Sequence, residues 1–203
     1  MGKIIDVTQL CTINNKRITN MCTILEKIKG KTPMELLEEY KIPLTPPIDL
    51  SKLLEKIGIS TIAQDFTEIE KNSNVEPGCV LGAAISKGDS LAIFYRKSDS
   101  YNRKKFTIAH ELAHCCLHTD SLRISHVELR IADYTTNEKE RDANTFAGEL
   151  LIPKNILMEK YEEFIIPSLK TLSEIFEVSY NVMAARLDHL GLSYLKDVKI
   201  DRE

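Results

Sequence analysis

Apolar residues recur at helical spacing along much of the chain and mark most of its predicted elements. A spacing of three and four positions places such residues on one face of a helix. The helices predicted in this way span residues 33–37, 49–57, 103–118, 137–151, 169–176 and 180–190, and residues 18–29 can form a further one. Thr32 is suited to cap the helix at 33–37, and Gly58 and Gly191 are suited to end two others.

Three other stretches carry the pattern of β-strands. Residues 59–66 alternate weakly between apolar and polar side chains, which predicts one strand. Residues 80–86 and 90–95 are apolar and rich in β-branched side chains, and Gly88 between them favours a hairpin turn. The order of the elements therefore predicts an α+β fold with a small antiparallel sheet rather than a doubly wound one.

The same pattern divides the chain into three parts. Residues 1–33 show little periodicity and are interpreted as an N-terminal extension. Residues 34–166 would form the folded core, and residues 167–203 a C-terminal helical subdomain that resembles a helix-turn-helix. The length of 203 residues is consistent with one domain that carries a small appendage.

Composition argues against several classes of protein. With 43% hydrophobic and 28% charged residues, the chain has the composition of a soluble globular protein. Its formal net charge of −3 argues against an extensive phosphate-binding surface, so direct nucleic-acid binding is not expected. Because no long apolar stretch and no signal peptide are recognisable, we expect a cytoplasmic protein without a membrane partner. The 5 cysteines include no Cys-x-x-Cys pair, which is typical of reduced thiols and not of a thiolate zinc site.

The strongest chemical signal is the sequence His-Glu-Leu-Ala-His at residues 110–114. Residues four positions apart on a helix have Cβ atoms about 6 Å apart on one face, so His110 and His114 can bind one metal ion. Phe106 falls on the same face, so both histidines should point toward the packed side, where a metal would satisfy them. Glu111 lies at the flank, where its carboxylate can take the proton of a water whose pKa a zinc ion lowers to about 7. Two surface histidines are the alternative interpretation.

A catalytic zinc needs a third protein ligand, and the helix predicted at 137–151 offers candidates. Glu140 falls on the apolar stripe of that helix, where a carboxylate is costly unless it is paired or metal-bound. Asp142 falls on the opposite side, so Glu140 is the preferred ligand. Asn144, one turn beyond Glu140, could hydrogen-bond a ligand histidine. The alternative is that Glu140 stands near the N-terminus of its helix only because the helix dipole favours a negative charge there.

The remaining histidines have weaker cases. His118 lies about 12 Å along the helix axis from His110, so it is expected to pack or to cap the helix end. His126 and His189 stand alone and are not expected to bind metal. The residues that could stabilise an oxyanion, among which the sequence gives no ranking, are Tyr134, Tyr161, Tyr180 and His126.

Two blocks of the sequence together resemble the ImmA/IrrE family of zinc metallopeptidases. The first is Lys-Lys-Phe-Thr-Ile-Ala-His-Glu-Leu-Ala-His at 104–114, and the second is Glu140-x-x-Ala143-Asn144-x-Phe146-Ala147-x-x-Leu150-Leu151-Ile152-Pro153. Weaker similarity reaches upstream to residues 93–95 and downstream to residues 172–192. The resemblance covers roughly residues 45–192, so nothing is carried over to the N-terminal extension.

The resemblance implies a compact zincin-like fold of the gluzincin type. It implies Zn²⁺ as cofactor, His110, His114 and Glu140 as its ligands, and Glu111 as catalytic base. It further implies a protein substrate, a helix-turn-helix transcriptional repressor. Cleavage of such a repressor would derepress a phage-like or mobile element or a stress regulon.

Three functions compete on these residues. In the favoured one, an endopeptidase, the hairpin at 80–95 offers an edge strand to an extended peptide, and residues 169–190 dock the repressor. In the second, the fold is a metal-bound interaction module, an anti-repressor that does not cut; an intact Glu111 argues against it. The third, a DNA-binding regulator, is disfavoured because residues 169–190 carry only Lys170 and Arg186 as strong cations.

Overall fold

The computed structural model describes residues 23–72, 74, 76–87, 89–118, 127–131 and 138–196. Its helices are α1 (Thr23–Ile28), α2 (Pro33–Glu39), α3 (Leu50–Ile57), α4 (Thr67–Asn72), α5 (Tyr101–Leu117), α6 (Glu138–Leu151), α7 (Lys154–Glu162), α8 (Leu169–Phe176) and α9 (Tyr180–His189). Its strands are β1 (Ile59–Gln64), β2 (Val80–Lys87), β3 (Ser90–Arg96) and β4 (Val127–Ile131). The α+β class predicted from the sequence is therefore confirmed, while α4, α7 and β4 were not predicted.

The described strands form one mixed sheet in the order β1-β3-β2-β4. Strands β2 and β3 form the predicted hairpin, and β4 continues the antiparallel pairing along β2. Strand β1, however, pairs with β3 in parallel, from Ile59 opposite Leu91 to Gln64 opposite Arg96. The predicted small antiparallel sheet is therefore wrong for this pair. The chain passes through α4 and β2 between β1 and β3, so β3 re-enters the sheet in the direction of β1.

The hairpin lies inside the sheet and not at its edge. Strand β3 is flanked by β1 and β2, and β2 is flanked by β3 and β4. The expectation that the hairpin offers an edge strand is therefore wrong. Within the described residues, the two edges belong to β1 and β4.

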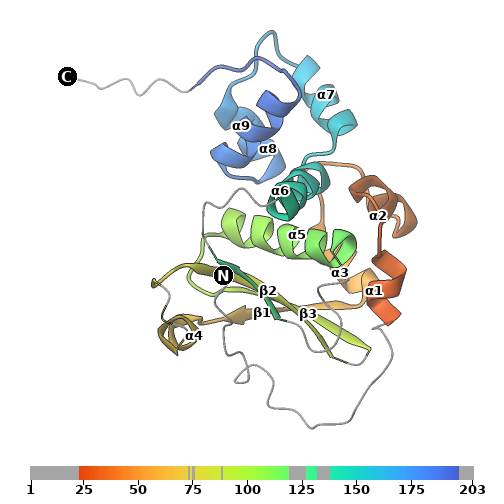
Figure 1. Ribbon diagram of the computed structural model, residues 1–203. Helices are drawn as coiled ribbons and strands as arrows, with labels where there is room; N and C mark the ends of the chain where they lie inside the picture. The colour runs from red at the N-terminus through yellow and green to blue at the C-terminus, as the bar shows by residue number, and fades with distance from the viewer. Residues whose placement is uncertain are drawn as a thin grey trace, which may run out of the picture.

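The helices form a layer on the sheet and a lobe beyond it (Figure 1). Helix α5 packs on β2 and β3, and α6 packs on α5. Helices α7, α8 and α9 lie beyond α6, on the side away from the sheet. Helix α5 therefore lies between the sheet on one side and α6 on the other.

One hydrophobic core runs through both parts. Leu112 of α5, Leu150 of α6 and Leu187 of α9 all belong to it and are fully buried. Leu25 and Ile28 of α1 belong to it as well, so the described end of the predicted N-terminal extension contributes to the core. The boundaries at residues 33 and 166 stay a prediction.

Candidate metal centre

Two histidines one turn apart on α5 meet beneath the surface of the molecule. His110 and His114 are 0% and 1% exposed, respectively. Their Nε2 atoms lie 2.9 Å apart, and their rings meet edge to face. The face of α5 that carries them is therefore the packed one, as the periodicity predicted.

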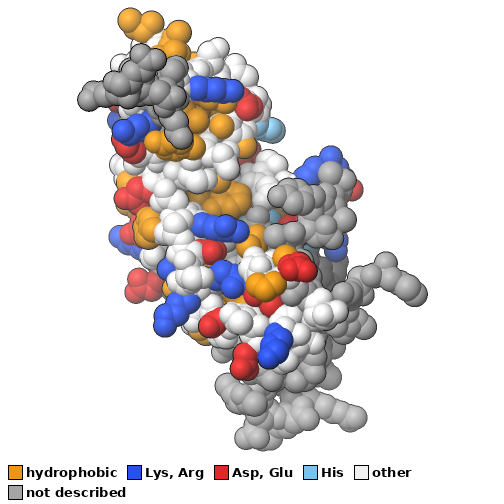
Figure 2. Space-filling view, turned by 90° about the vertical axis from the view of Figure 1, so that its left-hand side faces the viewer, with side chains coloured by type: hydrophobic (Ala, Val, Ile, Leu, Met, Phe, Trp, Pro, Cys, Tyr) orange, Lys and Arg blue, Asp and Glu red, His pale blue; other side chains and the backbone are white. Residues whose placement is uncertain are grey.

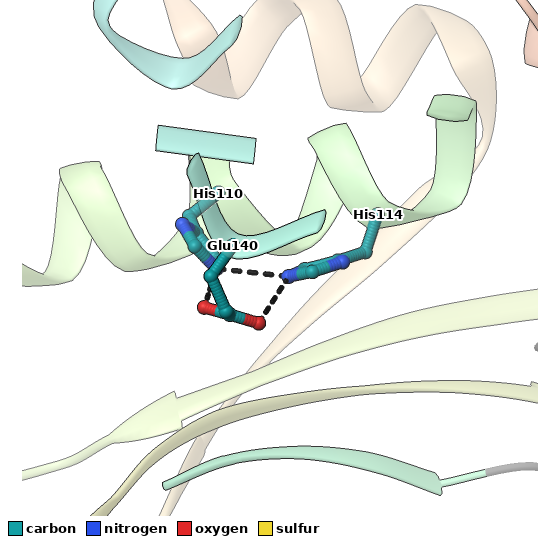
Figure 3. Close-up of side chains that lie close together, drawn as sticks. All are labelled: His110, His114 and Glu140. Atoms are coloured by element: carbon teal, nitrogen blue, oxygen red, sulfur yellow. Dashed lines mark hydrogen bonds and ion pairs between the residues drawn. The ribbon is translucent and has the colours of Figure 1, made fainter. Parts of the chain in front are cut away.

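A carboxylate from α6 completes the group. Glu140 Oε2 lies 3.2 Å from His110 Nε2, and Glu140 Oε1 lies 3.2 Å from His114 Nε2 (Figure 3). Glu140 is only 35% exposed, although it stands in the first turn of its helix. The structure thus brings His110, His114 and Glu140 together, with their donor atoms within 4.8 Å of one another.

Asn144 fixes the ring of His110. Its Oδ1 lies 2.9 Å from His110 Nδ1. An amide oxygen can only accept, so Nδ1–H donates and the neutral ring carries its lone pair on Nε2, which faces Glu140 and His114. Asn144 is therefore placed where the sequence predicted it, and it aims His110 at the other two side chains.

This group of atoms is stable only with a positive charge among its members. The ring nitrogens of His110 and then His114 lower the pKa of the Glu140 carboxyl, so it is ionised under ordinary conditions. Two imidazole lone pairs and a carboxylate at these distances repel one another unless protons or a cation lie among them. Ligands bound at 2.0–2.1 Å around a tetrahedral zinc stand about 3.3 Å apart, which is close to the observed separations. The donor set fits a zinc ion.

Glu111 lies outside this group, between α5 and the sheet. Its side chain is 0% exposed, and its Oε1 would lie 3.0 Å from a Cβ placed on Gly82 of β2. The same Cβ would come within 2.6 Å of Thr107 Cγ2. Gly82 therefore lets α5 approach β2 and leaves room for the carboxylate. The sequence analysis did not single out Gly82, although glycine inside a strand pattern signals close approach of another element.

Other candidates lie elsewhere. Asp142 is exposed and does not reach the group. His118 caps the end of α5, as expected, and its Nε2 lies 3.3 Å from the carbonyl oxygen of Lys139. The hydroxyl of Tyr161 donates to the carbonyl oxygen of Ser193 at 2.6 Å. His126 and Tyr134 lie outside the described residues.

The α+β fold and the donor set are compatible with a metallopeptidase domain. A family model described as the IrrE N-terminal-like domain, a peptidase family, matches residues 55–188. The chain belongs to this family, and the resemblance to ImmA/IrrE proteins is confirmed. No curated protein and no solved structure shows significant similarity to the chain.

Family membership sets the general chemistry. The chain contains a metallopeptidase-like domain, and a protein is the class of substrate that a peptidase family implies. Among the described residues, no helix combines the length and the apolar character needed to cross a membrane.

Proposed function

We propose that the chain is a zinc-dependent endopeptidase of the zincin-like, gluzincin type. In this proposal His110, His114 and Glu140 hold the metal, and Glu111 is the catalytic base. The convergence of two buried histidines with a carboxylate from a second helix carries the proposal. A module that only binds another protein has no need for a buried glutamate in the position of Glu111.

The chain's own residues supply the proton transfers. A zinc ion held by the three ligands would polarise the scissile carbonyl and lower the pKa of a bound water. Glu111 would accept the proton of the attacking water and deliver it to the departing amine. Asn144 keeps Nε2 of His110 directed at the centre. Its loss should therefore lower the affinity for the metal more than the stability of the fold.

The edge of the sheet offers a place for the peptide backbone. Among the described strands, β4 pairs with β2 alone, and β2 carries Gly82, beside which Glu111 lies. An extended substrate could add to β4 as a further strand through main-chain hydrogen bonds. Such pairing is insensitive to sequence, so selectivity must come from other contacts.

We further propose that the substrate is a helix-turn-helix repressor whose cleavage derepresses a mobile element or a stress regulon. The similarity of the 104–114 and 140–153 blocks to the ImmA/IrrE family supports this choice. A helix-turn-helix repressor found in a neighbouring gene is the substrate to test first: incubated with the zinc-loaded protein, it should be cut at one site, as intact-mass spectrometry can determine. An uncut repressor that nevertheless forms a complex would favour the anti-repressor module.

The surface gives little support to nucleic-acid binding by the chain itself. Figure 2 shows Lys and Arg side chains interspersed with Asp and Glu on the face it presents. In the helix pair α8–α9, Arg186 is 6% exposed, and its guanidinium is occupied by Glu149 and the carbonyl oxygen of Ile152. A recognition helix would present its cations to phosphates instead.

A further inference from the structure

A cavity lies on the side of α5 that faces away from the metal centre. It has a volume of about 430 Å³ and opens where the start of α3 meets β1, β3, α5 and the residue after α8. At 100° per residue, its α5 residues Lys104, Lys105 and Ile108 lie about 120–220° around the helix from His110. The described residues that line it include neither the metal donors nor Glu111. The cavity is therefore a separate site, and its volume is in the range of small-molecule pockets.

Two lysines bring positive charge to the walls of this cavity. Lys105 is only 7% exposed, and its Nζ lies 3.3 Å from the carbonyl oxygen of Phe176 and 3.7 Å from Glu177 Oε2. Burial lowers the pKa of the Lys105 ammonium in spite of the opposing effect of Glu177, so a further negative charge nearby would stabilise its charged form. Lys104 Nζ lies 6.0 Å from the centre of the Tyr95 ring, and Lys104 forms no ion pair with any described carboxylate.

The start of α3 adds a main-chain donor. Ser51 lines the cavity in the first turn of this helix, and its N–H has no acceptor among the described residues. The positive end of a helix dipole also attracts anions. The two carboxylates at the cavity are already engaged, because Asp49 accepts a 2.9 Å hydrogen bond from an N–H of the same turn and Glu177 accepts one of 3.3 Å from the Tyr101 hydroxyl. Lys104 and the helix end thus remain for an occupant with one negative charge.

The other walls suit an aromatic ring. Tyr95, Tyr101 and Ile108 line the cavity, so much of its surface is apolar. Tyr101 is 66% exposed, which leaves most of a large aromatic side chain in contact with solvent. A planar ring laid against the two tyrosines would bury this surface and gain the favourable geometry of aromatic pairs.

We propose that this cavity binds a small aromatic carboxylate. The carboxylate of the ligand would accept a hydrogen bond from the N–H of Ser51 and pair with Lys104, while its ring lies against Tyr95 and Tyr101. No residue of the metal centre takes part, so the site does not depend on the proposed peptidase function. Because the ligand would join α3, α5 and the end of α8, its binding should stabilise the folded chain.

Recognition of the charge is tested with indole-3-acetate and its neutral counterpart, indole-3-acetamide, in NMR titrations. Wild type should bind the carboxylate at least about tenfold more tightly than the amide, because only the carboxylate forms a charge-assisted contact. Lys104→Gln should lose this preference. The matched control is Lys52→Gln, which removes an exposed lysine of α3 that does not line the cavity and should keep the preference.

The location is tested by filling the cavity from β1. Thr61 is exposed and lines the cavity, and aromatic residues are well accommodated in strands. Thr61→Phe should therefore abolish binding of indole-3-acetate. Ile62→Phe is the matched control, because the next residue of a strand points to the opposite face of the sheet, and it should bind like wild type. Thermal unfolding without the probe checks that both variants are folded.

The outcomes that overturn the site are distinct. They are failure of indole-3-acetate to bind wild type, equal binding of the acid and the amide, and unchanged binding by folded Thr61→Phe. Should Thr61→Phe fail to fold, Lys104→Gln decides, and an unchanged preference in that variant would overturn the site. None of these measurements involves zinc or peptide cleavage, so absence of peptidase activity would contradict the proposed function and leave the carboxylate site intact.

Discussion

At the scale of single residues, the donor set was accessible to prediction because helical periodicity fixes directions. The angular positions of His110 and Glu140 follow from the sequence once their helices are assigned, and both point inward in the structure. Asn144 followed by the same argument and contacts His110. Gly82 could not be found in this way, because its partner Thr107 lies on a separate element whose approach is a tertiary property.

The proposed ligands can be tested by the metal content of variants. Purified wild type should contain one zinc per chain by elemental analysis, and His114→Ala should contain much less because one of three ligands is lost. Glu140→Gln should weaken metal binding, since a neutral amide replaces the carboxylate. The matched control is Asp142→Asn on the exposed side of α6, which should keep its zinc. The reverse order of the two α6 variants would mean that the wrong acid was chosen.

Cys116 makes stability sensitive to alkaline pH. Burial raises the pKa of its thiol to about 12, whereas an unfolded cysteine ionises near pH 8.5. The folded state therefore keeps a proton that the unfolded state loses, and its contribution to stability, complete below about pH 8.5, declines as pH rises toward 12. Urea unfolding should show a smaller loss of stability between pH 8 and 10 in Cys116→Ala than in wild type. An equal loss in both would contradict the assignment, and Cys79→Ala, half-buried, is the control.

At the scale of elements, the local sequence pattern identified the long helices and the hairpin but missed α4, α7 and β4. Helix α4 has 6 residues and β4 has 5, too few for periodicity to emerge. Helix α7 was missed because it begins directly after Pro153, which occupies its N-cap position, whereas a proline just after a helical pattern is typical of the end of a helix. The parallel pairing of β1 depends on the path of the chain between distant strands, which a local pattern does not encode.

The contact between α5 and β2 predicts that replacing glycine by alanine destabilises the protein at Gly82 but not at Gly148. In Gly82→Ala the new methyl group would meet Thr107 and Glu111 at less than ordinary contact distance. Overpacking of this kind costs about 1–3 kcal/mol of the free energy of unfolding. Gly148→Ala meets no neighbour within 4 Å and should be neutral or stabilise α6 by up to about 1 kcal/mol. Urea denaturation of the two variants measures the difference, and equal stabilities would contradict this description of the interface.

At the scale of the whole molecule, the C-terminal helices contribute side chains to the same hydrophobic core as α5 and α6. Leu172, Phe176 and Leu187 are each 0% exposed, and Lys105 of α5 donates to the carbonyl oxygen of Phe176 at 3.3 Å. Removing residues after 167 would expose this core, so truncation is a poor test of docking. Surface substitutions on α8 and α9 are the better one.

If the repressor docks on α8–α9, a surface substitution there should slow cleavage of the intact repressor but not of a short peptide. Tyr180, which is 46% exposed at the start of α9, is a suitable position. Tyr180→Ala should slow cleavage of the intact repressor about tenfold or more, because docking raises the local concentration of the scissile segment. Cleavage of a short peptide with the same bond should be unaffected if Tyr180 docks the repressor, and should fall in parallel if Tyr180 stabilises the oxyanion. Ile62→Ala, at a similarly exposed position of β1, is the control, and parallel loss on both substrates in Tyr180→Ala would exclude docking there.

The most direct test of the central claim compares wild type with Glu111→Gln at equal zinc content. Glu111 lies outside the group of metal donors, so the variant should fold and hold zinc like wild type. Loss of the proton acceptor should lower the rate of peptide-bond cleavage by about 10²–10⁴-fold, measured by mass spectrometry on the repressor or a peptide from it. Near-normal cleavage by zinc-loaded Glu111→Gln would contradict the proposed mechanism, and absence of cleavage by zinc-loaded wild type would contradict the peptidase function itself.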